Sequence, residues 1–211
     1  MGAEPAAGGN ELWFEYYDDT VVDDPCSEAD HAFLAGLRAR AVSQRWPCDP
    51  ADTFSIHDDE LGERALKVGV WLSDPVQRTA LVAFGLVFYR ERIVGDRIDY
   101  AEPFAFEGLR EAVMEAAGPL ESLVERAGEW FERLLTWPIE RRGWFAGNGQ
   151  LVYHEWVLSD IEEKLVVNAS WPPQRRPDRV VLVRGDRDRR ARAGKARRRT
   201  PSWPWRRRGG A

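Results

Sequence analysis

Two histidine–carboxylate groups have the residue types needed for metal or acid–base chemistry. They are His57 with Asp58, Asp59 and Glu60, and His154 with Glu155. Imidazole nitrogens and carboxylate oxygens could together bind a divalent metal or carry a proton to a substrate. However, adjacent residues rarely converge on one ion, and a strand over 151–158 would point His154 and Glu155 to opposite faces. We keep these residues as catalytic candidates, with an ordinary acidic loop as the competing interpretation.

The fingerprints of the common nucleotide-binding and hydrolytic sites are missing from the sequence. It contains no GxGxxG after a predicted strand and no GxxxxGK[ST] phosphate loop. The GxSxG elbow of serine hydrolases and the HExxH of zinc proteases are missing too. We therefore expect a protein without catalysis, without a cofactor and without a resident metal.

Glutamates recur at a four-residue spacing in two segments predicted as helices, 107–117 and 119–136. The set comprises Glu107, Glu111 and Glu115 in the first segment, and Glu121, Glu125, Glu129 and Glu132 in the second. On a helix this spacing stacks like charges, and each pair destabilises an isolated helix by about a few tenths of a kcal/mol. The pattern fits the solvated face of an acidic protein. It also fits a surface complementary to a basic protein partner.

Charge is divided unevenly along the chain. Residues 1–173 carry 32 acids and 15 bases, a net charge of −17, whereas residues 174–211 carry 3 acids and 15 bases, a net charge of +12. The candidate nucleic-acid-binding residues in the basic end are Arg197, Arg198, Arg199, Trp203, Trp205, Arg206, Arg207 and Arg208. Arginine contacts phosphates and indole stacks on bases, so weak, non-specific nucleic-acid binding is a second functional hypothesis. An arginine-rich extension without a role, from a GC-rich genome, is the competing interpretation.

Helices and strands are predicted in runs and do not alternate. The first helix follows Pro25, begins at the N-cap Ser27 and stops at Trp46-Pro47. Its apolar face consists of Phe33, Leu34, Leu37 and Ala41. Strand patterns cover 65–72, 79–89, 151–158 and 164–168. The order predicts an α+β fold, a mainly antiparallel sheet of about five or six strands with helices packed on one face.

Composition predicts one folded domain with two unfolded ends. We expect a disordered N-terminus over 1–10 and an acidic α+β domain over 11–173, extending to 184 if 180–183 form a strand. A basic and largely disordered tail over 174–211 follows. The start lacks the order of charges typical of a signal peptide, and no apolar run is long enough for a membrane span. A cytoplasmic protein without membrane contact, with reduced Cys26 and Cys48, is the resulting prediction.

The leading functional hypothesis is a non-catalytic binding protein whose acidic body engages a basic protein. Ten tryptophans in 211 residues mainly fill the core, and one or two exposed indoles would add an interaction surface. By charge analogy alone, such a domain resembles an inhibitor or immunity-type protein for a basic enzyme. Nucleic-acid association through the tail is the alternative, and an enzyme built on His57 and His154 is a second alternative.

Overall fold

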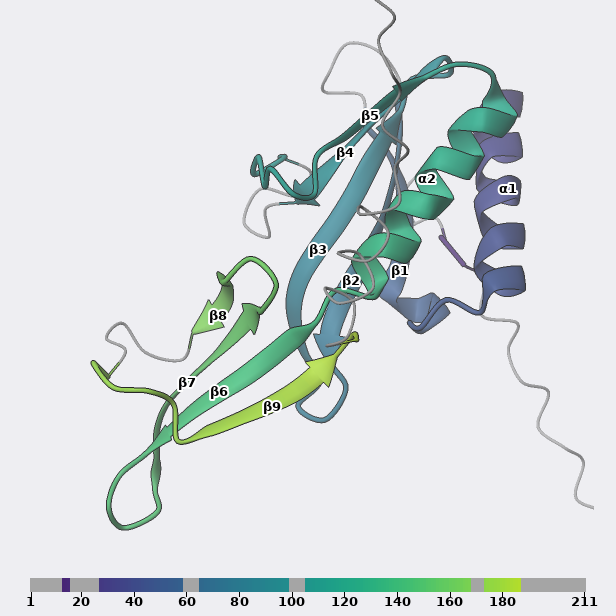
Figure 1. Cartoon of the computed structure of the whole chain (residues 1–211). Coiled ribbons are helices and arrows are strands. Elements are labelled where there is room, and N and C mark those ends of the chain that lie inside the picture. The colour runs from purple at the N-terminus through teal and green to yellow at the C-terminus, as the bar shows by residue number, and fades with distance from the viewer. Residues whose placement is uncertain (1–12, 16–26, 59–64, 99–104, 168–172, 187–211) are drawn as a thin grey trace, which may run out of the picture.

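The computed structural model describes residues 13–15, 27–58, 65–98, 105–167 and 173–186. Within them it contains two α-helices and two antiparallel sheets, of five and four strands (Figure 1). The α+β class, the antiparallel strands and the helices on one face are thus confirmed. The strands form two sheets, however, and not the one sheet of five or six strands that the sequence predicted. No helix in the described part of the chain is long and apolar enough to cross a membrane.

The first sheet is a meander whose strands lie side by side in chain order. Its strands are β1 (Thr53–Asp58), β2 (Ala65–Asp74), β3 (Thr79–Phe88), β4 (Arg92–Ile98) and β5 (Met114–Ala117). A short 3-10 helix, η1 (Pro50–Asp52), leads into β1. From Leu81 onward every residue of β3 is buried, in agreement with the predicted central strand.

Two helices cover one face of the first sheet, side by side (Figure 1). α1 (Glu28–Gln44) begins with a capping box, in which Ser27 and Asp30 bond to each other's backbone N–H groups. Its predicted apolar face is buried. α2 (Leu120–Leu135) lies against α1, where Gly36 meets the side chain of Val124 at a distance that leaves no room for a Cβ.

The helix predicted over 107–117 is not present. Residues 109–112 form a turn, and β5 pairs with β4 over Met114–Ala117. The predicted segment is short, carries stacked glutamates and contains Gly108 at a φ of +73°, so a helix there is marginal by itself. Pairing with the open edge of β4 satisfies the same backbone groups and places Ala116 against the core.

The second sheet has the order β8-β7-β6-β9. Its strands are β6 (Ile139–Phe145), β7 (Leu151–Leu158), β8 (Glu163–Val167) and β9 (Arg179–Arg184). β9 pairs with β6 across Val180 to Leu182, so the strand suggested at 180–183 is part of the folded structure. Residues 1–10 and 187–211 lie outside the described residues.

One hydrophobic core joins the two sheets. Its buried members come from both helices, from β2 and β3, and from β6 and β7 of the second sheet. Trp137 packs edge-to-face on Phe84 with ring centroids 5.6 Å apart, and Trp156 donates from Nε1 to Asp74 at 2.9 Å. The sheets therefore belong to one packed unit.

Candidate functional site

α2 carries an exposed row of glutamates, which we call the acidic ridge: Glu121, Glu125 and Glu129. The helix buries Leu123, Ala127 and Phe131 on the opposite side, so its 3.6-residue period forces the glutamates outward. Arg126 and Arg133 occupy the neighbouring side of the helix and line a hollow against β5. The ridge is thus the part of the predicted glutamate set that the fold presents to solvent as one row.

Glu132 follows the ridge in sequence, but its side chain bonds to α1 and to Trp46. Its carboxylate accepts hydrogen bonds from Arg40 Nε at 2.7 Å and Arg40 Nη2 at 2.9 Å, and from Trp46 Nε1 at 3.3 Å. The bond to Arg40 is the main cause that holds the pKa of Glu132 below its ordinary value. The same bond, with Glu129 and Glu125 behind it, raises the pKa of Arg40.

Glu107, Glu111 and Glu115 do not form a helical row, because their segment is a turn followed by β5. Glu107 forms an ion pair with Arg97, and Glu111 is exposed in the turn. Glu115 lies on β5 and reaches the same hollow as Glu129 of α2. The expectation that these three glutamates stack along one face of a helix is therefore wrong.

The two histidine–carboxylate groups lie on different sheets. His57 is on β1, with Nε2 3.5 Å from the Asp30 carboxylate, whereas His154 is on β7, edge-to-face on Trp156. Glu155 is buried and accepts a hydrogen bond from Tyr153, and burial together with Glu155 raises the pKa of Tyr153 to about 12.

The other members of the predicted sites are less fully described. Only the backbone of Asp58 is defined, and Asp59 and Glu60 lie outside the described residues. So do the nucleic-acid candidates Arg197, Arg198, Arg199, Trp203, Trp205, Arg206, Arg207 and Arg208. In the described ranges, no group of three or more His, Cys, Asp or Glu side chains is placed to hold a metal ion.

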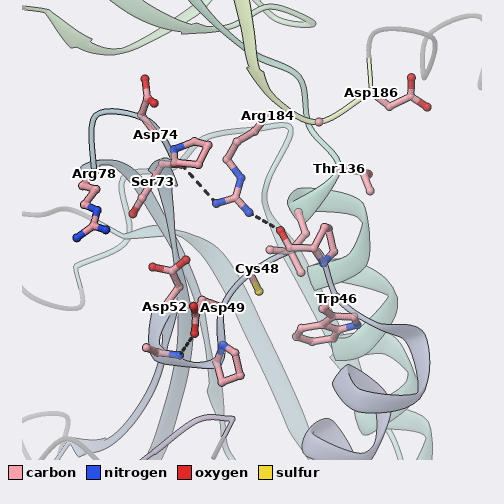
Figure 2. A pocket seen from close by; sticks show the side chains of 16 residues that line it. Trp46, Cys48, Asp49, Asp52, Ser73, Asp74, Arg78, Thr136, Arg184 and Asp186 are labelled. Atoms are coloured by element: carbon pink, nitrogen blue, oxygen red, sulfur yellow. Dashed lines mark hydrogen bonds between the residues drawn. The ribbon is translucent and has the colours of Figure 1, made fainter. Parts of the chain in front are cut away.

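A cleft of about 1140 Å³ lies where the two sheets meet (Figure 2). It is walled by the segment between α1 and β1, the β2–β3 turn, the C-terminal end of α2 and the end of β9. Its acidic side chains are Asp49, Asp52, Asp74 and Asp186, and its basic ones are Arg78 and Arg184. Its volume is slightly above the roughly 300–1,000 Å³ of sites for drug-sized ligands.

Arg184 crosses the middle of this cleft and ties its walls together. Its guanidinium donates to the carbonyl oxygens of Pro47 at 2.7 Å and Ser73 at 3.5 Å (Figure 2). Burial raises the pKa of the Cys48 thiol to about 12, so Cys48 is not a thiolate nucleophile at neutral pH. Burial also raises the pKa of Asp52. Asp49 and Asp52 are the carboxylates that the segment before β1 brings to the cleft.

Sequence reasoning did not find this cleft, because its charged residues come from segments far apart in the chain. Asp49 and Asp52 stand about 130 positions before Arg184. The local signal, Asp-Pro-Ala-Asp, indicates a capped turn, and Asp49 does cap η1. No local pattern in the sequence predicts that the end of β9, with Arg184, lies beside Asp49 and Asp52.

Comparisons of the chain with protein-family models, with curated proteins and with solved structures find no match.

Proposed function

We propose that the protein is a non-catalytic binding protein that engages a basic protein partner through the acidic ridge of α2. The observation that carries the proposal is the exposure of Glu121, Glu125 and Glu129 in one row on an ordered helix. Repulsion within a row of like charges destabilises the helix, and a cationic partner would relieve that repulsion and be attracted to the row.

The charge around the ridge supports this proposal. Arg40, the cation that α1 brings to this side of α2, is already held by Glu132 in a two-pronged pair. Glu121 and Glu125 are exposed, and Glu129 is exposed at the edge of the hollow that Arg126 and Arg133 also line. Residues 1–173 carry a net charge of −17. Such a field steers a basic protein toward the surface and raises its association rate. In physical terms this is what an inhibitor of a basic enzyme requires.

Charge reversal on the ridge tests the proposal. The tagged full-length chain is used to capture proteins from its native lysate at low salt, and captured proteins are identified by mass spectrometry. We expect the wild type to retain one or more basic proteins that high salt elutes. The E121K/E125K variant should bind an identified partner about tenfold more weakly or worse, because like charges then face each other.

The matched control is E15K/E111K, which changes the net charge by the same amount at exposed glutamates outside the ridge. Circular dichroism and melting temperature confirm that both variants fold. The proposal fails if the ridge variant and the control bind the partner equally well at low salt, since net charge would then explain the binding.

A further inference from the structure

A small hollow lies on one face of the second sheet, where the β2–β3 turn approaches it. Arg141, His154 and Arg179 contribute its cationic and imidazole groups, and Phe145, Leu151 and Val181 contribute apolar surface. Gln77 of the turn closes one side, and the volume is about 160 Å³. This hollow is separate from the acidic ridge and has the opposite charge.

The register of the sheet explains why a hollow forms there. Gly143 of β6 is paired with His154 of β7 on one side and with Arg179 of β9 on the other. Directly paired residues point to the same face of a sheet. His154 and Arg179 therefore flank a position without a side chain. A Cβ built at Gly143 would lie in ordinary contact with Leu151 and Phe145, at 3.4 Å from each, so the absence of a side chain there adds to the space of the hollow.

Arg141 stands in the next row of the same face, between Trp156 and Val181. Its Nη1 is buried and makes no hydrogen bond to the described part of the protein. Asp74 Oδ2 lies 3.5 Å from Nη1, in an ion pair that does not have the geometry of a hydrogen bond. Because an unsatisfied buried donor is costly, Nη1 requires a further acceptor.

Asp74 can offset only one of the two arginine charges at the hollow. Its carboxylate is already used by Trp156 Nε1 at 2.9 Å and by the backbone N–H groups of Val76 and Gln77. Burial opposes the charge on Asp74, yet these hydrogen bonds hold its pKa below the ordinary value. Asp74 forms an ion pair with Arg141, and Arg179 adds a second cation, exposed at the rim of the hollow.

We propose that this hollow binds a small carboxylate whose short apolar stem lies on Phe145, Leu151 and Val181. Arg141 and Arg179 would donate to the carboxylate oxygens, as guanidinium groups do in two-pronged pairs. The volume is below the roughly 300–1,000 Å³ of sites for drug-sized ligands, so the ligand is a small acid or the end of a larger molecule.

His154 gives the site a dependence on pH. Burial and the charge of Arg141 lower its pKa, so the imidazole is neutral at pH 7. The charged groups near it are Arg141 on β6 and Arg179 on β9, with Asp74 behind Arg141. A bound carboxylate would raise the pKa of His154, and by reciprocity binding would tighten as the pH falls through that pKa.

Titration of the full chain with isobutyrate, followed by NMR of the histidine ring and tryptophan indole signals, tests the proposal. We expect saturable shifts of His154 and Trp156 and a raised pKa of His154 in the complex. Isobutyramide, which has the same shape without the charge, should bind about tenfold more weakly or worse. N-acetylvaline distinguishes the two sources: binding equal to that of isobutyrate indicates a polypeptide end, and exclusion indicates a free small acid.

Two variants separate the site from the fold. Gly143→Ala narrows the hollow by one methyl group without changing charge, and Arg179→Gln removes the exposed cation; each should weaken isobutyrate binding several-fold at unchanged melting temperature. Arg176→Gln, an exposed arginine outside the hollow, is the control and should bind as the wild type does. Unchanged binding in Gly143→Ala would overturn the proposal. So would equal affinity for isobutyrate and inorganic phosphate, because the apolar stem would then contribute nothing.

Discussion

Glu132 belongs to the predicted glutamate set, but in the folded protein its carboxylate connects two helices. Its bonds to Arg40 and Trp46 connect α2 to α1 and to the residue that follows the C-cap of α1. The carboxylate and the guanidinium are each partly exposed, at 31% and 24% of their side chains. Solvent screening therefore limits what the pair contributes to stability.

Replacing Glu132 by Gln should lower the free energy of unfolding by about 1–2 kcal/mol near neutral pH, because charged hydrogen bonds are lost. The folded-state pKa of Glu132 is lowered, so its contribution is present above the unfolded-state pKa of about 4.3. That contribution disappears as the pH falls through the folded-state pKa. Urea denaturation across a pH series measures both effects.

Glu121→Gln, an exposed change on the same helix, is the control and should leave stability nearly unchanged. A difference between wild type and Glu132→Gln that persists undiminished in acid would contradict the ionic explanation.

Residue positions on the regular elements could be predicted from the sequence, whereas long-range partners could not. Phe33, Leu34, Leu37 and Ala41 were predicted to share one face of a helix, and all four are buried. The partner of Glu132 is 92 positions away in the chain. Local spacing contains no information about that pairing, so the sequence placed Glu132 with the exposed glutamates.

At the scale of elements, strand pairing decides the outcomes that periodicity leaves open. A four-residue spacing of glutamates suits a helix, yet Glu111 and Glu115 lie in a turn and on β5. Val180 to Val183 is a weak strand pattern, yet β9 forms because β6 has a free edge. In both cases the available partner strand, which lies elsewhere in the chain, outweighs the local preference.

β9 should therefore be required for full stability. A chain of residues 1–186 should melt as the full chain does, whereas residues 1–173 should melt at a lower temperature. The shorter chain loses the pairing of β9 with β6, the packing of Val183 on the core and the bonds of Arg184 to Pro47 and Ser73.

Thermal unfolding followed by circular dichroism compares the three chains. Equal melting temperatures for residues 1–173 and 1–186 would show that β9 contributes nothing, and would place the domain boundary at 173.

At the scale of the whole molecule, the sequence predicted the class of the fold and missed its division. Helices and strands in runs correctly indicate α+β. The split into two sheets depends on where β6 begins after α2. Trp137 and Ile139 lie at that point and are both buried and apolar, so their residue types suit one continuous sheet as well as two separate sheets. The cleft and the small hollow both lie at the junction of the sheets, so neither could be predicted before the split was known.

Charge is segregated at this scale as well. Residues 1–186 carry 32 + 2 acids and 15 + 4 bases, a net charge of −15, and residues 187–211 carry one acid and 11 bases, a net charge of +10. We propose that the basic end gives the chain weak, sequence-independent affinity for single-stranded nucleic acid. Binding of an oligonucleotide to the full chain should be micromolar or weaker, and should fall on the order of a decade over a few-fold rise in salt.

Residues 1–186 should show no such binding, because the acidic body repels phosphates. Fluorescence anisotropy of both chains across a salt series measures this. Equal, salt-insensitive behaviour of the two chains would remove nucleic acid from the functions of this protein.

The bond from Trp156 to Asp74 has a consequence for how the molecule opens. The indole hydrogen is sequestered between the sheets, and it can exchange with solvent deuterium only when β7 moves away from the end of β2. Its exchange rate therefore reports the population of the separated state. Because Arg141 contacts the same carboxylate, any ligand that draws Arg141 toward itself alters the rate. Exchange of the Trp156 indole hydrogen thus measures the opening of the contact between the two sheets, beside which the cleft and the small hollow both lie.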